Sequence, residues 1–184
     1  MVVLVQIRRL GIWATVSFLF VSCSIRKNPQ IRLGAYYFVG KADESLAVAE
    51  NGKLLEMSRH LLEAVIQKKT DVLVSMIDPV QGAIIDAKIM VSYEKVKAAL
   101  NDEMHPLHKT LWNEKAMQET DSTGELHCYQ KYFQSVDEIE VLLFYYSHSE
   151  AEVRLNFKNR PSVGVMGNLI FQKRQDRWIL LNFF

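Results

Sequence analysis

The feature that most constrains this fold is a series of strand-like segments after Gly124 that are joined by very short connections. The linkers QSVD, SE, NRPS and RQD are two to four residues long, too short for the crossover that parallel neighbours need. The sequence therefore predicts an antiparallel meander. Alternation of Val153, Leu155 and Phe157 with polar residues indicates that one face of this sheet is solvated. The five predicted strands, rich in β-branched and aromatic residues, are ELHCYQKYF, EIEVLLFYYSHS, AEVRLNFKN, VGVMGNLIFQK and RWILLNFF.

The part of the chain before this sheet is predicted to be mostly helical. Residues 43–77 place apolar side chains at three- and four-residue spacing, the pattern of a helix with one buried face. Asn51-Gly52 is a candidate break in this helix, and 71–76 is expected to form a second, short helix.

A turn is expected at 78–82, where Gly82 allows positive φ. It is followed by the strand-like segment 83–93, by a helix over 93–100 and by 105–119, which is either helical or an irregular loop. Helices followed by a sheet are typical of the α+β class, so we expect N-terminal helices packed on a curved antiparallel sheet of about five strands. A chain of 184 residues without an internal repeat indicates a single domain, which we place at 43–184.

The N-terminal segment has the layout of a secretory signal peptide. Arg8 and Arg9 precede the uncharged segment 10–22, which is 13 residues long. A membrane-spanning helix needs about 20 apolar residues, so this segment is short for a span. We expect residues 1–22 to be a cleaved signal peptide, with plain secretion and an uncleaved anchor as the alternatives.

The end of this segment, FVSC at 20–23, resembles a bacterial lipobox in the looser form seen in spirochaete-like lipoproteins. The resemblance implies that Cys23 receives a diacylglyceryl group, becomes the new N-terminus and is acylated on its amine. Several acyl chains would anchor the protein stably. Ser24 resembles the sorting residue of outer-membrane lipoproteins, which implies a lipid-anchored protein of the bacterial cell envelope, at the outer membrane. The polar segment 23–42 is then a lipidated tether.

Two further motifs resemble a known fold family. IDPVQG at 77–82 and LIFQKRQDRWILLNFF at 169–184 are similar to elements of the cystatin-like cone proteins, the ketosteroid isomerase and SnoaL superfamily. The resemblance covers about 54–184 and implies helices folded onto a bent antiparallel sheet around a cone-shaped pocket. The first motif also resembles the His-Pro-x-x-Gly turn of small bacterial lipoproteins of this shape, with Asp78 where that turn commonly has His.

This resemblance supplies the candidate catalytic residues. In the isomerases an Asp acts as general base beside a tyrosine, and Asp78 and Asp86 are the candidate bases here, with Tyr145 as the candidate partner. A carboxyl group suits this role when a dry pocket raises its pKa. The simpler interpretation is that Tyr145 belongs to the core of the sheet or to its surface.

The histidines and cysteines do not form a convincing reactive cluster. His105 and His108 are three residues apart, but Pro106 disfavours a helix at His105, so we expect a surface pair and no metal site. His127 and Cys128 are adjacent on a predicted strand and would point to opposite faces, so Cys128 is expected to be a buried small apolar group. A disulfide between Cys128 and the N-terminal cysteine would tie the tether to the core and is the less favoured alternative.

The charge balance argues against one class of partner. A formal net charge of +1 offers no basic field for nucleic acid. We expect a non-enzymatic binding or interaction module, without a cofactor, that takes a small apolar ligand or a protein partner. The alternatives are a small pocket enzyme of isomerase or dehydratase type with an Asp base, and a purely structural surface protein. A binder needs an open apolar cleft, whereas the enzyme needs a closed pocket with an acid beside Tyr or His.

Overall fold

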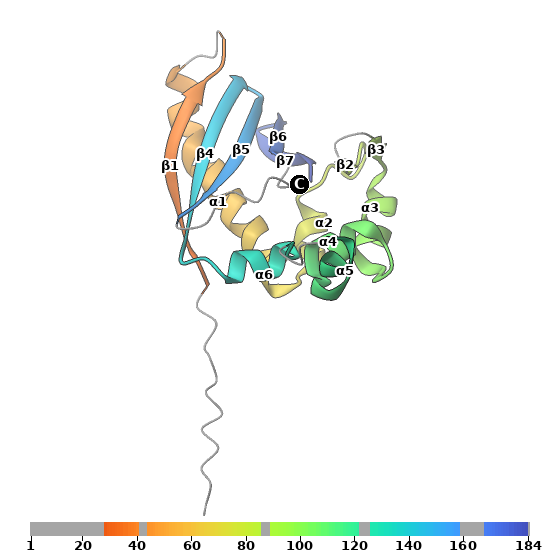
Figure 1. Ribbon diagram of the computed structural model, residues 1–184. Helices are drawn as coiled ribbons and strands as arrows, with labels where there is room; N and C mark the ends of the chain where they lie inside the picture. Colours follow the sequence, from red (N-terminus) through yellow and green to blue (C-terminus); the bar gives the residue numbers. More distant parts are fainter. Residues whose placement is uncertain (1–27, 41–43, 86–88, 122–125, 159–167, 184) are drawn as a thin grey trace, which may run out of the picture.

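The computed structural model describes residues 28–40, 44–85, 89–121, 126–158 and 168–183 (Figure 1). Cys23, the predicted signal peptide and Asp86 lie outside these residues. The described elements are β1 (Gln30–Phe38), α1 (Glu44–Gln67), α2 (Thr70–Ser75), β2 (Ala83–Ile85), β3 (Ile89–Val91), α3 (Tyr93–Asn101), α4 (Pro106–Trp112), α5 (Glu114–Thr120), α6 (Tyr129–Gln134), β4 (Glu138–Ser147), β5 (Glu150–Phe157), β6 (Leu169–Arg174) and β7 (Arg177–Asn182).

The predicted meander forms the centre of the sheet. Strands β4, β5, β6 and β7 pair in succession, each antiparallel to the next. The β4–β5 connection is tight, because Ser147 pairs directly with Glu150. The β6–β7 turn places Gln175 and Asp176 at positive φ. The α+β class and the antiparallel order of these four strands are therefore confirmed.

The rest of the sheet differs from the expectation. The described part holds one seven-stranded mixed sheet, in the order β1-β4-β5-β6-β7-β2-β3, rather than about five antiparallel strands. β1 pairs in parallel with β4, and a bridge between Ile84 and Asn182 joins β2 in parallel with β7. Both parallel pairs join segments far apart in the chain, so the intervening helices supply the long crossover that parallel pairing requires. A strand also precedes the helices, since β1 begins at Gln30 within the segment expected as a tether.

The prediction of a strand at ELHCYQKYF is wrong. Its second half forms the helix α6, in which Tyr129, Tyr132 and Phe133 are buried. These three residues stand at the three- and four-residue spacing of a helix face, which outweighs the β-propensity of aromatic residues. Two open alternatives are also decided: α1 continues through Asn51-Gly52, and 105–119 forms the helices α4 and α5.

Helix α1 crosses one face of the sheet behind β1 and β4, while α2 to α5 gather below the β2–β3 hairpin (Figure 1). Leu54, Leu61 and Leu62 of α1 are fully buried, in one cluster with Leu143 of β4 and Phe171 of β6. Side chains therefore fill the space between α1 and the sheet, where a cone-shaped pocket was expected. Hollows lined by the described residues lie at the margins of this core. Across the described part of the chain, no helix is long and apolar enough to span a membrane.

Candidate functional site

Asp78 stabilises a turn and is not placed to act as a general base. Its Oδ1 accepts hydrogen bonds from the backbone N–H of Val80 at 2.7 Å and of Gln81 at 3.0 Å, and its Oδ2 lies 3.4 Å from Nη1 of Arg174. The backbone N–H groups of Gln81 and Val80, with a smaller contribution from Arg174, hold the pKa of Asp78 below its usual range. A carboxylate that is ionised and bonded on both oxygens is a poor general base.

Tyr145 lies in the core. The residue is 2% exposed, and its hydroxyl donates to Oδ1 of Asn51 on α1 at 2.7 Å. Burial raises the pKa of this phenol. Tyr145 thus joins β4 to α1, whereas Asp78 lies at the turn beside β6, so the structure does not bring the two candidates together. Asp86, the other candidate base, is outside the described residues.

A buried carboxylate that the sequence analysis missed clamps α1 to the β6–β7 hairpin. Glu50 is 9% exposed and accepts from Nε1 of Trp178 at 2.7 Å, Nζ of Lys173 at 3.0 Å and Nζ of Lys53 at 3.1 Å. Burial alone would raise the pKa of Glu50, but these hydrogen bonds outweigh it and lower that pKa. The position of Glu50 in the sequence could have indicated that it is buried, because it stands four residues before Leu54, on the apolar stripe of α1.

A second carboxylate organises the start of α6. Oε1 of Glu114 lies 2.5 Å from Nδ1 of His127, and its Oε2 accepts from the backbone N–H of Cys128 at 2.9 Å. Cys128 is fully buried, as expected, and burial raises the pKa of its thiol to about 11. The thiolate is the reactive form of cysteine, so this cluster does not provide a nucleophile near neutral pH.

The two expected surface histidines have separate environments. His105 caps α4, because its Nδ1 accepts from the backbone N–H of Leu107 at 3.1 Å. His108 lies within α4 against the ring of Trp112, at 4.9 Å between ring centroids. Within the described ranges, no group of three His, Cys, Asp or Glu side chains is placed to hold a metal ion.

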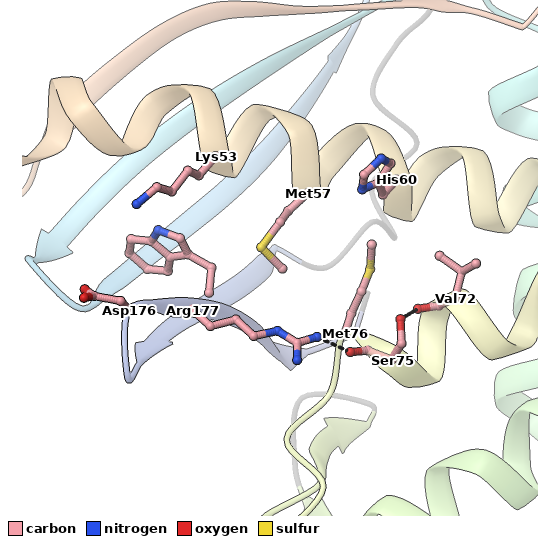
Figure 2. Close-up of a pocket in the computed structure, with 9 residues that line it drawn as sticks. Lys53, Met57, His60, Val72, Ser75, Met76, Asp176 and Arg177 are labelled. Carbon is pink, nitrogen blue, oxygen red and sulfur yellow. Dashed lines mark hydrogen bonds between the residues drawn. The ribbon is translucent and has the colours of Figure 1, made fainter.

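One hollow lies between α1, the end of α2 and the start of β7; we call it the α1–β7 hollow (Figure 2). Its volume is about 360 Å³. Met57 points from α1 toward β7 (Figure 2). Lys53 on α1 and Arg177 on β7 lie on opposite sides of the hollow (Figure 2). The guanidinium of Arg177 donates to the carbonyl oxygen of Ser75 at 2.7 Å. Its lining residues are Lys53, Met57, His60, Val72, Ser75, Met76, Asp176, Arg177 and Trp178.

A larger groove lies between the β2–β3 hairpin and α3; we call it the α3 groove. Its volume is about 480 Å³. Five aliphatic residues from the two sides form most of its wall, and the hairpin residue Ile89 is 68% exposed. Polar groups enter only from α3 and the segment after it. The lining residues are Ile85, Ile89, Val91, Lys95, Ala98, Ala99, Asp102 and His105.

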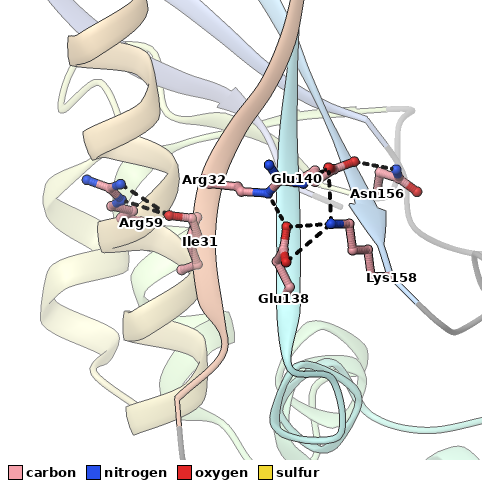
Figure 3. A network of polar contacts seen from close by, with 7 residues as sticks. All are labelled: Ile31, Arg32, Arg59, Glu138, Glu140, Asn156 and Lys158. Carbon is pink, nitrogen blue, oxygen red and sulfur yellow. Dashed lines mark hydrogen bonds and ion pairs between the residues drawn. The ribbon is translucent and has the colours of Figure 1, made fainter.

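The open face of the sheet carries a polar network (Figure 3). Arg32 of β1 bonds to both Glu138 and Glu140 of β4. Lys158 lies 3.2 Å from Glu138, and Asn156 donates to Glu140 at 2.8 Å. The charges in this network are matched by their own neighbours, so it is a weaker candidate for ligand recognition than the two hollows.

Comparison of the chain with protein-family models, curated proteins and solved structures found no significant match. The candidate site is therefore assigned from geometry and chemistry alone. Of the two hollows, the α3 groove is the larger and the more aliphatic, and its position was not predicted from the sequence.

Proposed function

We propose that this protein is a lipid-anchored component of the bacterial cell envelope whose domain binds a small apolar ligand without catalysing a reaction. The observation that carries the binding proposal is the α3 groove. Its volume of about 480 Å³ lies within the range of about 300–1,000 Å³ that is typical of small-molecule sites. Mainly aliphatic walls with a few polar groups also match that class of site.

The residues of the groove suggest how a ligand lies in it. Ile85 and Val91 of the hairpin and Ala98 and Ala99 of α3 line the hollow, and the two alanines leave space that larger side chains would fill. An alkyl chain here would gain about 0.8 kcal/mol for each CH₂ group that it buries.

The polar residues lie on one side of the groove. His105 uses Nδ1 as the acceptor of its helix cap, so the neutral ring carries its proton on Nε2 and can donate from there. Lys95 adds a cation and Asp102 an acceptor. The lining therefore favours an apolar ligand that carries a hydrogen-bonding group near Asp102 and His105.

The arrangement of the domain supports the resemblance to cone-shaped binding proteins in outline. The β4–β7 meander with α1 packed against it is the part that fits this resemblance, whereas β1 before the helices and the two parallel pairs depart from it. The proposed binding site lies at the hairpin rather than inside the cone, because core side chains fill the space beneath α1. Catalysis with Asp78 as base is not favoured, since that carboxylate is ionised and held in a turn.

The binding proposal is tested by titration with 11-(dansylamino)undecanoic acid, whose fluorescence rises on transfer from water to an apolar site. Ala98 is exposed on α3, so Ala98→Trp is expected to fold and to fill the groove. Ala49→Trp is the matched control, an exposed alanine on α1 outside both hollows. We expect saturable binding that is lost in Ala98→Trp and kept in Ala49→Trp. Absence of saturable binding, or equal binding by both variants, would refute the assignment.

The anchor is a separate part of the proposal, supported by the lipobox-like residues 20–23. Six residues, 24–29, separate Cys23 from the first residue of β1. The seven residue steps from Cys23 to Gln30 span at most about 25 Å, so the domain would stay close to the membrane surface. Metabolic labelling with radioactive palmitate is expected to mark the wild-type chain and not Cys23→Ser. Persistent labelling of the variant would contradict the anchor.

A further inference from the structure

The α1–β7 hollow combines a soft apolar floor with an uncompensated cation. Met57 of α1, Met76 directly after α2 and Trp178 of β7 contribute to its lining. Thioether and indole groups are polarizable and make favourable contacts with aromatic rings. A flat ring is therefore a better match to this floor than an alkyl chain.

The charges around the hollow differ in what they already bind. Lys53 pairs with Glu50 at 3.1 Å, and His60 lies 3.0 Å from Glu56. Arg177 differs: within the described residues its guanidinium has one hydrogen bond, to the carbonyl oxygen of Ser75, and no carboxylate partner. A guanidinium has five N–H donors, so most of those on Arg177 remain available for an anion.

We infer that the α1–β7 hollow is a second binding site, specific for a small aromatic carboxylate. The aromatic ring packs on the thioethers of Met57 and Met76, and the carboxylate pairs with the guanidinium of Arg177. The planar fork of an arginine matches the two oxygens of a carboxylate better than a lysine ammonium does. Lys53 adds positive potential from the facing helix. No lining residue is shared with the α3 groove, so this site does not depend on the proposed function.

The test is isothermal titration calorimetry of the full chain with 2-naphthoate and with its uncharged analogue 2-naphthylmethanol. We expect saturable binding of 2-naphthoate that is at least 10-fold tighter than binding of the alcohol. Arg177→Gln is expected to weaken 2-naphthoate at least 10-fold and to leave the alcohol unchanged. Arg177→Lys keeps the charge but lacks the planar guanidinium, so its affinity for 2-naphthoate is expected to lie between those of the wild type and Arg177→Gln.

Two control variants locate the site. Arg154→Gln removes an arginine from the open face of the sheet, where it contacts Glu152 and the ring of Phe144, and is expected to bind 2-naphthoate as the wild type does. Ala98→Trp blocks the α3 groove and is also expected to leave this binding intact, even if the apolar-ligand proposal fails. The inference is overturned if the wild type does not bind 2-naphthoate, if both naphthalene ligands bind equally, or if Arg177→Gln binds 2-naphthoate as well as Arg154→Gln does.

Discussion

Among the glycines that the structure describes, Gly82 is the position where one added methyl group should cost the most. It has φ +81° and lies where the chain enters β2, and a Cβ atom built on it would be 1.8 Å from the carbonyl oxygen of Val91. Real Cβ contacts essentially never fall below 3.0 Å, so Gly82→Ala must push the β2 and β3 backbones apart. That movement acts directly on the α3 groove, because Val91 lines it.

The magnitude follows from two separable costs. A left-handed backbone costs an L-residue about 1–2 kcal/mol, and backbone shifts that relieve an overlap add about 1–3 kcal/mol. Alanine restricts the unfolded chain more than glycine does, which offsets about 0.4–1 kcal/mol of this destabilisation. Gly82→Ala should therefore lower the free energy of unfolding by about 2–4 kcal/mol.

Two other glycines separate these costs. Gly40 has φ +80°, but a methyl group added there would have no other atom within 4 Å, so Gly40→Ala keeps the backbone cost alone, about 1 kcal/mol. Gly52 lies inside α1 with open space around it, so Gly52→Ala should stabilise the protein by about 0.5–1 kcal/mol.

The assay is urea unfolding at neutral pH followed by far-ultraviolet circular dichroism, with free energies extrapolated to water. The expected order of stability is Gly52→Ala, wild type, Gly40→Ala and Gly82→Ala, from highest to lowest. If Gly82→Ala were as stable as Gly40→Ala, the close approach of Gly82 to β3 would be wrong. The dansyl titration of Gly82→Ala should also show weaker binding in the α3 groove.

Three further predictions concern the polar groups. Because the pKa of Glu50 is lowered in the folded state, its stabilisation is present above its ordinary value of 4.5 and is lost as pH falls through the folded value. Glu50→Gln should lower unfolding free energy by about 1.5–3 kcal/mol at pH 7 and flatten its acid dependence in urea titrations; an unchanged slope would exclude this role. In a Cys23→Ser background, the thiol of Cys128 should react with Ellman's reagent at pH 8 only after unfolding in urea, because burial raises its pKa to about 11; rapid labelling of the native protein would contradict this. Asp78→Asn retains an acceptor for Val80 and Gln81 but loses the charge beside Arg174, so it should destabilise less in thermal unfolding than Asp78→Ala, which should cost about 1–2 kcal/mol; equal losses would show that the charge, not the turn, matters.

The sequence predicted those elements whose pattern is local and repeated. The stripe of α1 and the alternation of Val153, Leu155 and Phe157 in β5 each report one buried face over many residues. The turn at Asp78–Gly82 was also correctly predicted, since Gly82 adopts positive φ there. At α6 the aromatic content favours a strand, whereas the spacing of Tyr129, Tyr132 and Phe133 is that of a helix face, and the helix forms.

The candidate sites were harder to predict from the sequence. Asp78 and Tyr145 have the residue types of an acid–base pair, but type alone does not report that each already has partners within the fold. The two hollows are assembled from segments that are separated along the chain, such as the hairpin and α3, or α1 and β7. No spacing rule within one segment encodes a cavity of this kind.

The sequence by itself therefore determined the α+β class, the long amphipathic helix and the antiparallel order of four of the five predicted strands, because periodic burial and short connections act within a segment or between neighbours. Only the tertiary structure decided that β1 joins the sheet in parallel, with Arg32 meeting Glu140 across 108 positions, and that β2 and β3 extend its other edge. It also decided that Glu50 is a buried clamp and that the hollows lie at the margins of the core. These outcomes depend on which distant surfaces meet, and they follow from the packing of the whole chain rather than from any one stretch of it.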